Sequence, residues 1–250
     1  MRVEIWSDIA CPWCYIGKAR FERGLAAFPH RDGVEVVHRS FELDPNRDPA
    51  DVEPVVGMLA RKYGRTPEEA RAMEEHVAAA ARAEGLGYRT EGRDHGSTFA
   101  LHRLLHLARA HGRQEVLLDL AYRANFAEER SVFDPVTALA LAVEAGLDED
   151  EARAVLADPD AYAEEVRADE REAASLGASA VPFFVVDRRY GISGGQPADV
   201  FTEALTRAWE TREDQEQERS RERSQGQDPA PSAAGAAPAC TPDGCEPSAG

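Results

Sequence analysis

The pattern of apolar and polar residues first predicts a β-α-β unit at the start of the chain. In residues 2–7, RVEIWS, apolar and polar side chains alternate, and β-branched and aromatic types favour a strand. The stretch CPWCYIGKARFERGLAAF, from residue 11, is helical, with Pro12 in the first turn, where its missing N–H leaves no hydrogen bond unmade. Residues 33–43 return to a strand pattern. This order predicts two parallel strands joined by a right-handed crossover.

A long helical block follows, from Thr66 to about residue 174, with no strand signal inside it. Thr66 and Pro67 have the types preferred at the N-cap and first position of a helix. Three glycines fall where helices should end, at Gly112, Gly146 and Gly177. We expect about five helices, over residues 66–86, 97–112, 114–129, 134–147 and 148–177.

The last third of the chain returns to β structure and then loses its apolar pattern. Residues 180–187, AVPFFVVD, predict a strand, residues 188–195 a hairpin partner, and residues 196–210 a closing helix. From residue 211 the chain is charged and then rich in small residues and proline, which predicts a disordered tail.

These elements predict an α/β fold interrupted by an insertion. One discontinuous domain comprises residues 1–45 and 175–210, and an inserted all-α helical subdomain comprises residues 46–174. Residues 211–250 form the flexible tail.

Charge and composition limit the classes of function. The 250 residues include 29 Lys and Arg against 46 Asp and Glu, a net charge of −17. Nucleic acid and anionic membranes would repel such a chain, so we expect neither as a partner. No apolar run approaches the ~20 residues of a membrane span, and the N-terminus lacks the features of a signal peptide. We therefore expect a cytoplasmic protein, in which closely spaced cysteines are more often catalytic or metal-binding than structural.

Cys11 and Cys14 carry the strongest chemical signal. A C-x-x-C sequence that opens a helix after a strand exposes the first cysteine to unpaired N–H groups and the positive end of the helix dipole, which stabilise a thiolate. Trp13 adds no positive charge, so these backbone groups must supply most of that stabilisation. The spacing predicts Cys11 as the attacking nucleophile and Cys14 as the buried thiol that resolves a mixed disulfide.

At this point the chain resembles a known family. IWSDIACPWCYIGK, the later GASAVPFFVVDRRYGISGGQP and the helical block between them are similar to the DsbA family of thioredoxin-fold oxidoreductases, in particular its FrnE-like branch, over about residues 1–210. The resemblance implies a thioredoxin-like fold in which Pro182 is cis and lies near Cys11. It also implies that the Val181 backbone pairs with an extended substrate, and that Pro12 and Trp13 face that substrate.

The implied activity is thiol–disulfide exchange on protein or peptide substrates. No bound cofactor is expected; glutathione or another thiol could serve as reductant, alongside a recycling reductant or oxidant. One alternative is a glutathione-dependent isomerase or transferase of the kappa type, similar to 2-hydroxychromene-2-carboxylate isomerase, although such relatives typically carry serine where this chain has Cys11. A second alternative is a redox- or zinc-sensing chaperone.

Weaker candidates surround the cysteine pair. Asp8, three residues before Cys11, is either a proton relay or a turn and capping residue. His102 and His106 share one face of a predicted helix, with His95 before them. Because no carboxylate or cysteine nearby completes a ligand set, we expect no metal there. A surface or subdomain-interface position, or a place beside the substrate groove, is the expectation for these histidines.

A second cysteine pair, Cys240 and Cys245, lies in the tail and encloses the turn sequence TPDG. The spacer over residues 211–239 would span ~30 Å as a flexible chain, against a radius of gyration of ~18 Å for the body, so this pair could reach Cys11. It is interpreted as an auxiliary redox couple. A four-cysteine zinc site and incidental cysteines are the alternatives.

Overall fold

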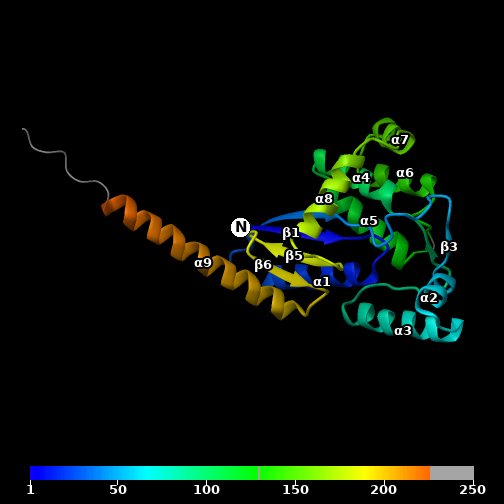
Figure 1. Ribbon diagram of the computed structural model, residues 1–250, viewed down its shortest axis with the longest axis horizontal. Coiled ribbons are helices and arrows are strands. Elements are labelled where there is room, and N and C mark those ends of the chain that lie inside the picture. The colour runs from blue at the N-terminus through cyan, green and yellow to red at the C-terminus, as the bar shows by residue number, and fades with distance from the viewer. Residues whose placement is uncertain (129, 226–250) are drawn as a thin grey trace, which may run out of the picture. The chain divides into compact units, whose positions relative to one another are not determined.

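The computed structural model describes residues 1–128 and 130–225, and the chain divides into two compact units, Met1–Glu210 and Thr211–Gly250. The first unit is built around a four-stranded sheet in the order β2-β1-β5-β6 (Figure 1). The strands are β1 (Arg2–Ser7), β2 (Glu35–Ser40), β5 (Phe183–Val186) and β6 (Tyr190–Ser193).

The first two strands run parallel, joined by helix α1 (Pro12–Ala27) and the 3-10 turn η1 (Arg31–Gly33), as the β-α-β pattern predicts. Strand β5 pairs antiparallel with β1, and β6 pairs antiparallel with β5, which confirms the expected hairpin. In the register, Val3 of β1 lies between Val36 and Val186. The central strand β1 is therefore hydrogen-bonded to segments from both ends of the domain.

Helix α1 and the first turns of α9 (Ala198–Gln225), which belong to the first unit, cover one face of this sheet (Figure 1). Val3 and Ile5, two residues apart on β1, point to this side because side chains alternate along a strand. They pack with a cluster of aromatic and aliphatic side chains from β5, α1 and the first turns of α9, namely Phe21, Phe28, Phe184, Val186, Phe201, Leu205 and Ala208. This apolar layer fixes α1, and with it the cysteines at its N-terminus.

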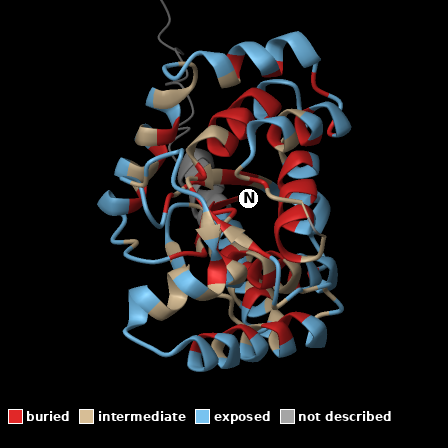
Figure 2. Cartoon of the chain, turned by 90° about the vertical axis from the view of Figure 1, so that its right-hand side faces the viewer, coloured by how far each residue is buried: buried red, intermediate tan, exposed pale blue. Residues whose placement is uncertain are grey.

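Five further helices cover the other face of the sheet. They are α4 (Phe99–Ala110), α5 (Gln114–Phe126), α6 (Pro135–Glu144), α7 (Glu149–Ala157) and α8 (Ala163–Ser175). Leucines and alanines from these helices form one continuous core with Trp6 of β1, and Cys11 and Cys14 lie at its edge. Figure 2 shows the buried residues gathered on the inward faces of the helices. The inserted helices thus share their core with the active-site loop.

A smaller layer comprises α2 (Val55–Tyr63), α3 (Pro67–Ala83) and two short strands, β3 (Glu53–Pro54) and β4 (Asp94–His95). The predicted helix start at Thr66 is confirmed, since the Thr66 side chain accepts from the Glu69 amide and the Glu69 side chain accepts from the Thr66 amide. The β3–β4 pair was not predicted, and β4 lies within the block, from Thr66 to about residue 174, for which no strand signal was found. Strands of two residues are too short to leave a periodic pattern.

Two predicted helix boundaries are wrong. The helix expected over residues 148–177 is split into α7 and α8, because Pro159 lacks an amide hydrogen and Tyr162 adopts a left-handed conformation with φ of 58°. Helix α9 runs to Gln225, past the end predicted near residue 210. The glycine helix ends are confirmed, with positive φ at Gly112, Gly146 and Gly177.

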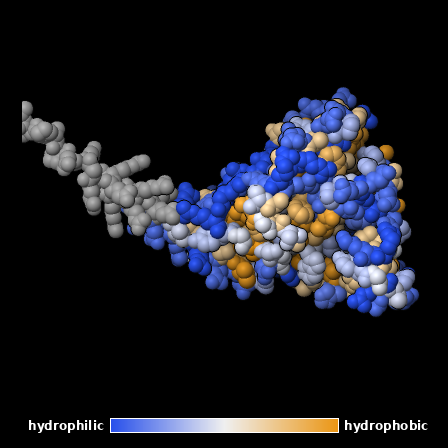
Figure 3. All heavy atoms as spheres, viewed as in Figure 1, coloured by the Kyte–Doolittle hydropathy of each residue, from blue (hydrophilic) through white to orange (hydrophobic). Residues whose placement is uncertain are grey.

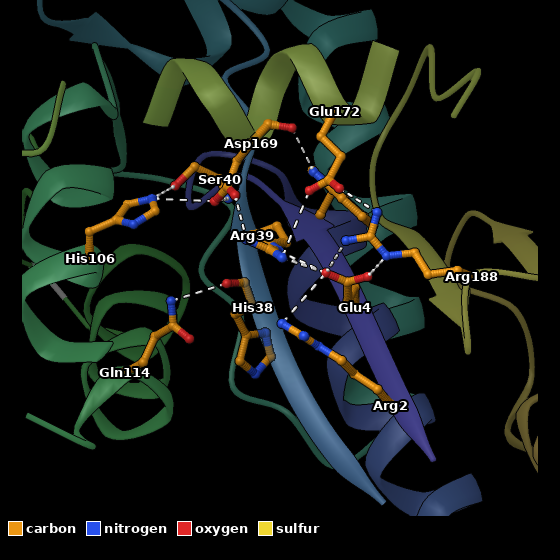
Figure 4. Close-up of polar contacts among 11 residues, drawn as sticks. Arg2, Glu4, His38, Arg39, Ser40, His106, Gln114, Asp169, Glu172 and Arg188 are labelled. Carbon is orange, nitrogen blue, oxygen red and sulfur yellow. Dashed lines mark hydrogen bonds and ion pairs between the residues drawn. The ribbon is translucent and has the colours of Figure 1, made fainter. Parts of the chain in front are cut away.

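A network of buried charges joins α8 to the edge of the sheet (Figure 4). Arg39 of β2 donates through Nη1 to Asp169 Oδ1 at 2.9 Å and through Nε to Glu4 Oε1 at 3.0 Å. Asp169 Oδ2 also accepts from the Ser40 amide at 2.9 Å, and the Asp169 carbonyl accepts from Trp6 Nε1 at 2.8 Å. Strands β1 and β2 are thereby tied to the last inserted helix.

The surface is strongly polar, in keeping with the net charge of −17. The face in Figure 3 is mostly hydrophilic, with apolar residues visible as scattered patches. Among the described residues, none of the helices combines the length and apolar character needed to cross a membrane.

Replacing Asp169 by Asn should destabilise the fold by about 3 kcal/mol, because the buried Asp169 carboxylate that accepts from Arg39 and from the Ser40 amide would be lost. Burial opposes ionisation of Asp169, but hydrogen bonds from His106 and Ser40 and the charge of Arg39 outweigh it, so its pKa is lowered. A lowered pKa stabilises the fold above the usual carboxyl range, and the stabilisation disappears as the pH falls through the folded-state pKa.

Urea unfolding of the parent and of Asp169→Asn at neutral and acidic pH measures this difference. The gap in free energy of unfolding should shrink in acid. Asp32→Asn, at a fully exposed carboxylate, is the control and should change stability by less than about 0.5 kcal/mol. A gap that is the same at both pH values would contradict the electrostatic account.

Candidate active site at the N-terminus of helix α1

The two cysteines lie where β1 gives way to α1. Cys11 is the N-cap residue, with extended backbone, and its amide donates to the Asp8 carbonyl at 3.1 Å. The Cys11 carbonyl accepts from the amides of Cys14 and Tyr15. No side chain caps the helix, so the cysteine occupies the position where amide hydrogens are unpaired. This is the N-terminal position that the sequence predicts for the nucleophile.

Both thiols are free and largely enclosed. Cys11 is 5% exposed and Cys14 is 1% exposed. Burial, reinforced by a hydrogen bond with the Cys11 sulfur and by its charge, raises the pKa of Cys14 well above its ordinary value. Cys14 is therefore held as a neutral thiol beneath Cys11.

The loop before β5 places the Val181–Pro182 dipeptide next to Cys11. The Val181–Pro182 peptide bond is cis, as the family resemblance implied. The Cys11 sulfur lies 3.7 Å from the Val181 carbonyl oxygen, a long contact of the kind sulfur makes. Residues 170 positions apart in sequence thus meet at one point, and the Val181 backbone flanks the thiol.

Close packing of α1 fixes this meeting point. A Cβ placed on Gly17 would lie 2.9 Å from Pro182 Cγ and 3.2 Å from Gly195 Cα. A Cβ on Gly195 would in turn lie 3.2 Å from Gly17 Cα and from the Trp13 carbonyl. A side chain at Gly17 would therefore force a neighbouring atom to move, and one at Gly195 would press tightly on the backbone of α1.

Asp8 lies under the loop that carries Cys11, and it is 2% exposed. Its Oδ2 accepts from the Leu43 amide at 2.7 Å and its Oδ1 from the Ala10 amide at 3.2 Å. Burial opposes its ionisation, but interactions with His102 and with the Leu43 amide prevail and lower the pKa of Asp8. The Asp8 side chain therefore makes the backbone contacts expected of a turn and capping residue. It is also a buried carboxylate, as a proton relay requires.

A cavity of about 200 Å³ opens beside Cys11. Cys11, Pro12 and Trp13 form one side, and Trp13 is 36% exposed. Helices α2 and α3 supply the opposite apolar wall, with Val55, Met58, Leu59, Met73 and Val77. Polar residues also line the cavity, namely Asp44, Lys62, Glu74, Arg93 and His95. The groove combines flexible apolar side chains with charges of both signs.

The wall formed by α2 was not among the sequence predictions. Val55, Met58 and Leu59 follow the i, i+3, i+4 spacing of an amphipathic helix, so a signal was present in residues 54–63. Nothing in that spacing says that the apolar side faces a cysteine forty residues earlier in the chain. The placement comes from the fold.

The three histidines occupy different positions. His95 lines the groove. His102 is 1% exposed and contacts Asp8, with 3.5 Å between Nε2 and Oδ1. His106 Nε2 lies 3.2 Å from Ser40 Oγ and 3.3 Å from Asp169 Oδ2, at the interface between α4 and the sheet (Figure 4). Sequence spacing placed His102 and His106 on one face but did not indicate their separate partners.

Within residues 1–128 and 130–225, one group of carboxylates comes close enough to share a cation, formed by Glu22, Glu115 and Asp119. The Lys18 ammonium already lies among them, 2.6 Å from Asp119 Oδ1. The three carboxylates therefore pair with Lys18 and link α1 to α5. Cys240 and Cys245, the predicted auxiliary pair, lie outside the described residues.

The sheet order, the helix-opening C-x-x-C and the neighbouring X-Pro loop define a thioredoxin-like dithiol protein. A DSBA-like thioredoxin domain matches residues 2–206. The chain therefore belongs to the DsbA-like thiol–disulfide oxidoreductase family.

Solved structures agree with this assignment. A probable DsbA oxidoreductase of Streptomyces coelicolor, SCO1869, is 71% identical, with a TM-score of 0.82 over 84% of this chain and 90% of that one. The cytosolic disulfide reductase DsbM of Pseudomonas aeruginosa is 22% identical, with a TM-score of 0.57 over 83% and 100% of the two chains. A 2-hydroxychromene-2-carboxylate isomerase is 12% identical, with a TM-score of 0.56 over 86% and 98%. The last two share the fold. A comparison with curated proteins gives no match.

Gly17→Ala should reduce the rate of disulfide exchange, by about tenfold, since the added methyl group must displace Pro182 and the Val181 carbonyl beside Cys11. Gly57→Ala is the matched control, because Gly57 lies in α2 with open space around its Cα. Turnover of a disulfide substrate, measured with the free energy of unfolding, separates misplacement from loss of fold. Equal turnover in the two variants would contradict the role given to this contact.

Proposed function

We propose that the protein exchanges disulfides with protein or peptide substrates through Cys11 and Cys14, Cys11 attacking and Cys14 resolving. The observation that carries this proposal is the asymmetry of the pair. Cys11 caps α1 beside the groove and the Val181 carbonyl, whereas Cys14 is buried with a raised pKa. A sulfur that lines the groove at the first position and a protonated thiol at the second suit an attack followed by a resolution.

In the reducing direction, the Cys11 thiolate attacks a substrate disulfide and expels one substrate thiolate. Cys14 then loses its proton and attacks the Cys11 sulfur, so that a Cys11–Cys14 disulfide forms and the second substrate thiolate leaves. Two electrons pass from the protein dithiol to the substrate, and each leaving thiolate can take up a proton. The oxidising direction is the reverse sequence, and a separate thiol or disulfide partner restores the starting state.

The groove supplies the substrate site in this proposal. An extended peptide would pair with the Val181 backbone next to Pro182 and lay its side chains between Trp13 and the α2–α3 wall. Met58 and Met73 suit this role because unbranched thioether side chains repack against different partners. Pro12 and Trp13 would contact the substrate from the cysteine side. Glutathione or another small thiol remains the expected reductant, with no bound cofactor required.

Two further elements of the proposal come from the sequence. Asp8 would relay the Cys14 proton, which its buried position under the loop supports. Cys240 and Cys245 would exchange electrons with the first pair from the tail. The cytoplasm, where a reducing environment favours catalytic dithiols over structural disulfides, is the expected compartment.

Cys14→Ser should trap substrates, because Cys11 can still attack but the mixed disulfide can no longer be resolved. Mass spectrometry after non-reducing gel separation would identify the trapped proteins. Cys11→Ser is the matched control and should trap none. If Cys14→Ser instead retained full turnover with glutathione, the isomerase or transferase alternative would replace this proposal.

Removing residues 211–250 tests the auxiliary pair. With Cys240 and Cys245 absent, turnover driven by a protein reductant should fall severalfold, whereas single-turnover attack by Cys11 should not change. The double variant Cys240→Ser with Cys245→Ser separates loss of the thiols from loss of the tail. Unchanged turnover in both proteins, with protein and small-molecule reductants, would eliminate the electron relay.

A further inference from the structure

The groove beside Cys11 carries charged side chains that the exchange reaction itself does not use. They are two carboxylates, Asp44 and Glu74, and two cations, Lys62 and Arg93. A charge that is already paired within the protein has little attraction left for a substrate, whereas an unpaired charge can select one. The partners of these four groups therefore decide which kind of peptide the groove prefers.

The Glu74 carboxylate is already occupied. It is 4% exposed, and its Oε2 lies 3.3 Å from Arg93 Nη2 and accepts from the Tyr88 hydroxyl at 3.2 Å. The Arg93 guanidinium is held in turn between two rings, with its Cζ 4.8 Å from the centres of both Tyr88 and Phe126. Burial raises the pKa of Glu74 despite the charge of Arg93. The Glu74–Arg93 pair therefore adds no net negative charge to the groove.

Asp44 and His95 also leave the groove without an attractive group for a cation. Asp44 Oδ2 lies 3.9 Å from Nη1 of Arg47, whose side chain is buried. Burial, followed by the charge of Arg47, lowers the pKa of His95, so its ring is neutral at neutral pH. Both acids that line the cavity thus have an arginine as partner.

Lys62 differs from these groups because no acid is paired with it. Within residues 1–128 and 130–225, its ammonium makes neither a hydrogen bond nor an ion pair, and the residue is exposed. After burial and Arg47, the charge of Lys62 is a further cause of the lowered pKa of His95, which places the ammonium within electrostatic reach of the cavity. The chain has 46 acidic residues against 29 basic ones, so an unpaired cation beside the nucleophile runs against its overall charge.

Helix α2 places this ammonium next to the apolar wall of the groove. Lys62 follows Met58 by four residues and Leu59 by three, so the three side chains share one face of the helix, and all three line the cavity. Met58 and Leu59 are half-buried. The face thus offers an apolar surface and then, about 5–6 Å further along, a cation.

We propose that the groove selects peptide substrates that carry an acidic side chain close to the reactive cysteine, and that Lys62 recognises this side chain. The proposal rests on the exchange reaction proposed above and names its substrate class. An apolar side chain of the peptide would cover Met58 and Leu59, and an Asp or Glu carboxylate would accept from the Lys62 ammonium. Because Lys62 is exposed, salt screens the contact, which gives a modest preference rather than an absolute requirement.

The preference can be measured with short cysteine peptides joined by a disulfide to an aromatic thiol whose thiolate absorbs visible light. The Cys11 thiolate attacks the peptide sulfur, a Cys11–peptide disulfide forms, the peptide–aryl disulfide breaks, and one aromatic thiolate is released. The peptides differ at one position, which holds Glu, Gln or Lys and is moved stepwise along both sides of the cysteine. Every protein should be full length and carry Cys240→Ser and Cys245→Ser, so that thiols of the tail do not react.

At low ionic strength, the parent should react about fivefold faster with the best Glu peptide than with its Gln counterpart, and slowest with the Lys peptide. Lys62→Gln should bring the ratio of the Glu and Gln rate constants close to one, and Lys62→Glu should make the Lys peptide the fastest. In about 1 M salt, where the screening length is ~3 Å, the parent should also lose the preference.

Arg61→Gln is the matched control on the same helix. It removes the same charge from the neighbouring position, but Arg61 pairs with Glu53 and is not among the residues that line the cavity. The ratio of the two rate constants should therefore keep its parental value in this variant.

A parent that reacts equally fast with Glu and Gln peptides at every position would overturn the inference, as would a preference for Glu that survives in Lys62→Gln. An equal loss of the preference in Arg61→Gln would also overturn it, because the overall charge of α2 rather than Lys62 would then be responsible. The exchange reaction is judged separately from the absolute rates. A chromophore released as fast by Cys11→Ser as by the parent would overturn the proposed function, whatever the ratios between peptides.

Discussion

The half-buried guanidinium of Arg39, held between two buried carboxylates, is the constraint on which the arrangement of this domain depends. Glu4 and Asp169 come from opposite ends of the domain, and neither carboxylate would be tolerated in the interior without a cation. Once Arg39 is in place, strand β1, strand β2 and helix α8 can occupy only one relative position. The inserted helices must therefore close over the same face of the sheet that carries Trp6.

The packing of the inserted helices against the sheet determines the geometry of the active site. β1 delivers Asp8 and the cysteine loop, α4 reaches under the loop with His102, and β5 begins with the Val181–Pro182 peptide. The groove wall of α2 and α3 belongs to a separate small layer. In the proposed function, redox chemistry belongs to the densely packed part of the molecule, and substrate contact belongs to side chains at its margin. Such a division allows the thiol environment to stay constant while different partners are accommodated.

The sequence predicted the elements with strong local signals. Alternation in β1, the helix-opening cysteines, the capping residues around Thr66 and the glycine helix ends are short-range features, and each was found where expected. Long-range features were not accessible in the same way. The partners of His102 and His106 depend on how α4 crosses the sheet, and a spacing of four residues is the same whether a histidine meets a carboxylate or solvent. The α2 wall was missed because an amphipathic helix does not specify which element covers its apolar face.

Gly17 contacts both Pro182 and Gly195, so substitutions at these three positions, which are distant in sequence, depend on one another. A methyl group at Gly17 would have to be matched by a shift of Pro182, which would also move the carbonyl that borders the thiol, and a methyl group at Gly195 would press on the backbone of α1 at Trp13 and Gly17. Evolutionary change at these positions should therefore be concerted. Divergent relatives that keep both cysteines but differ at one of the three should differ at the others as well, and their reactivity should have shifted with them.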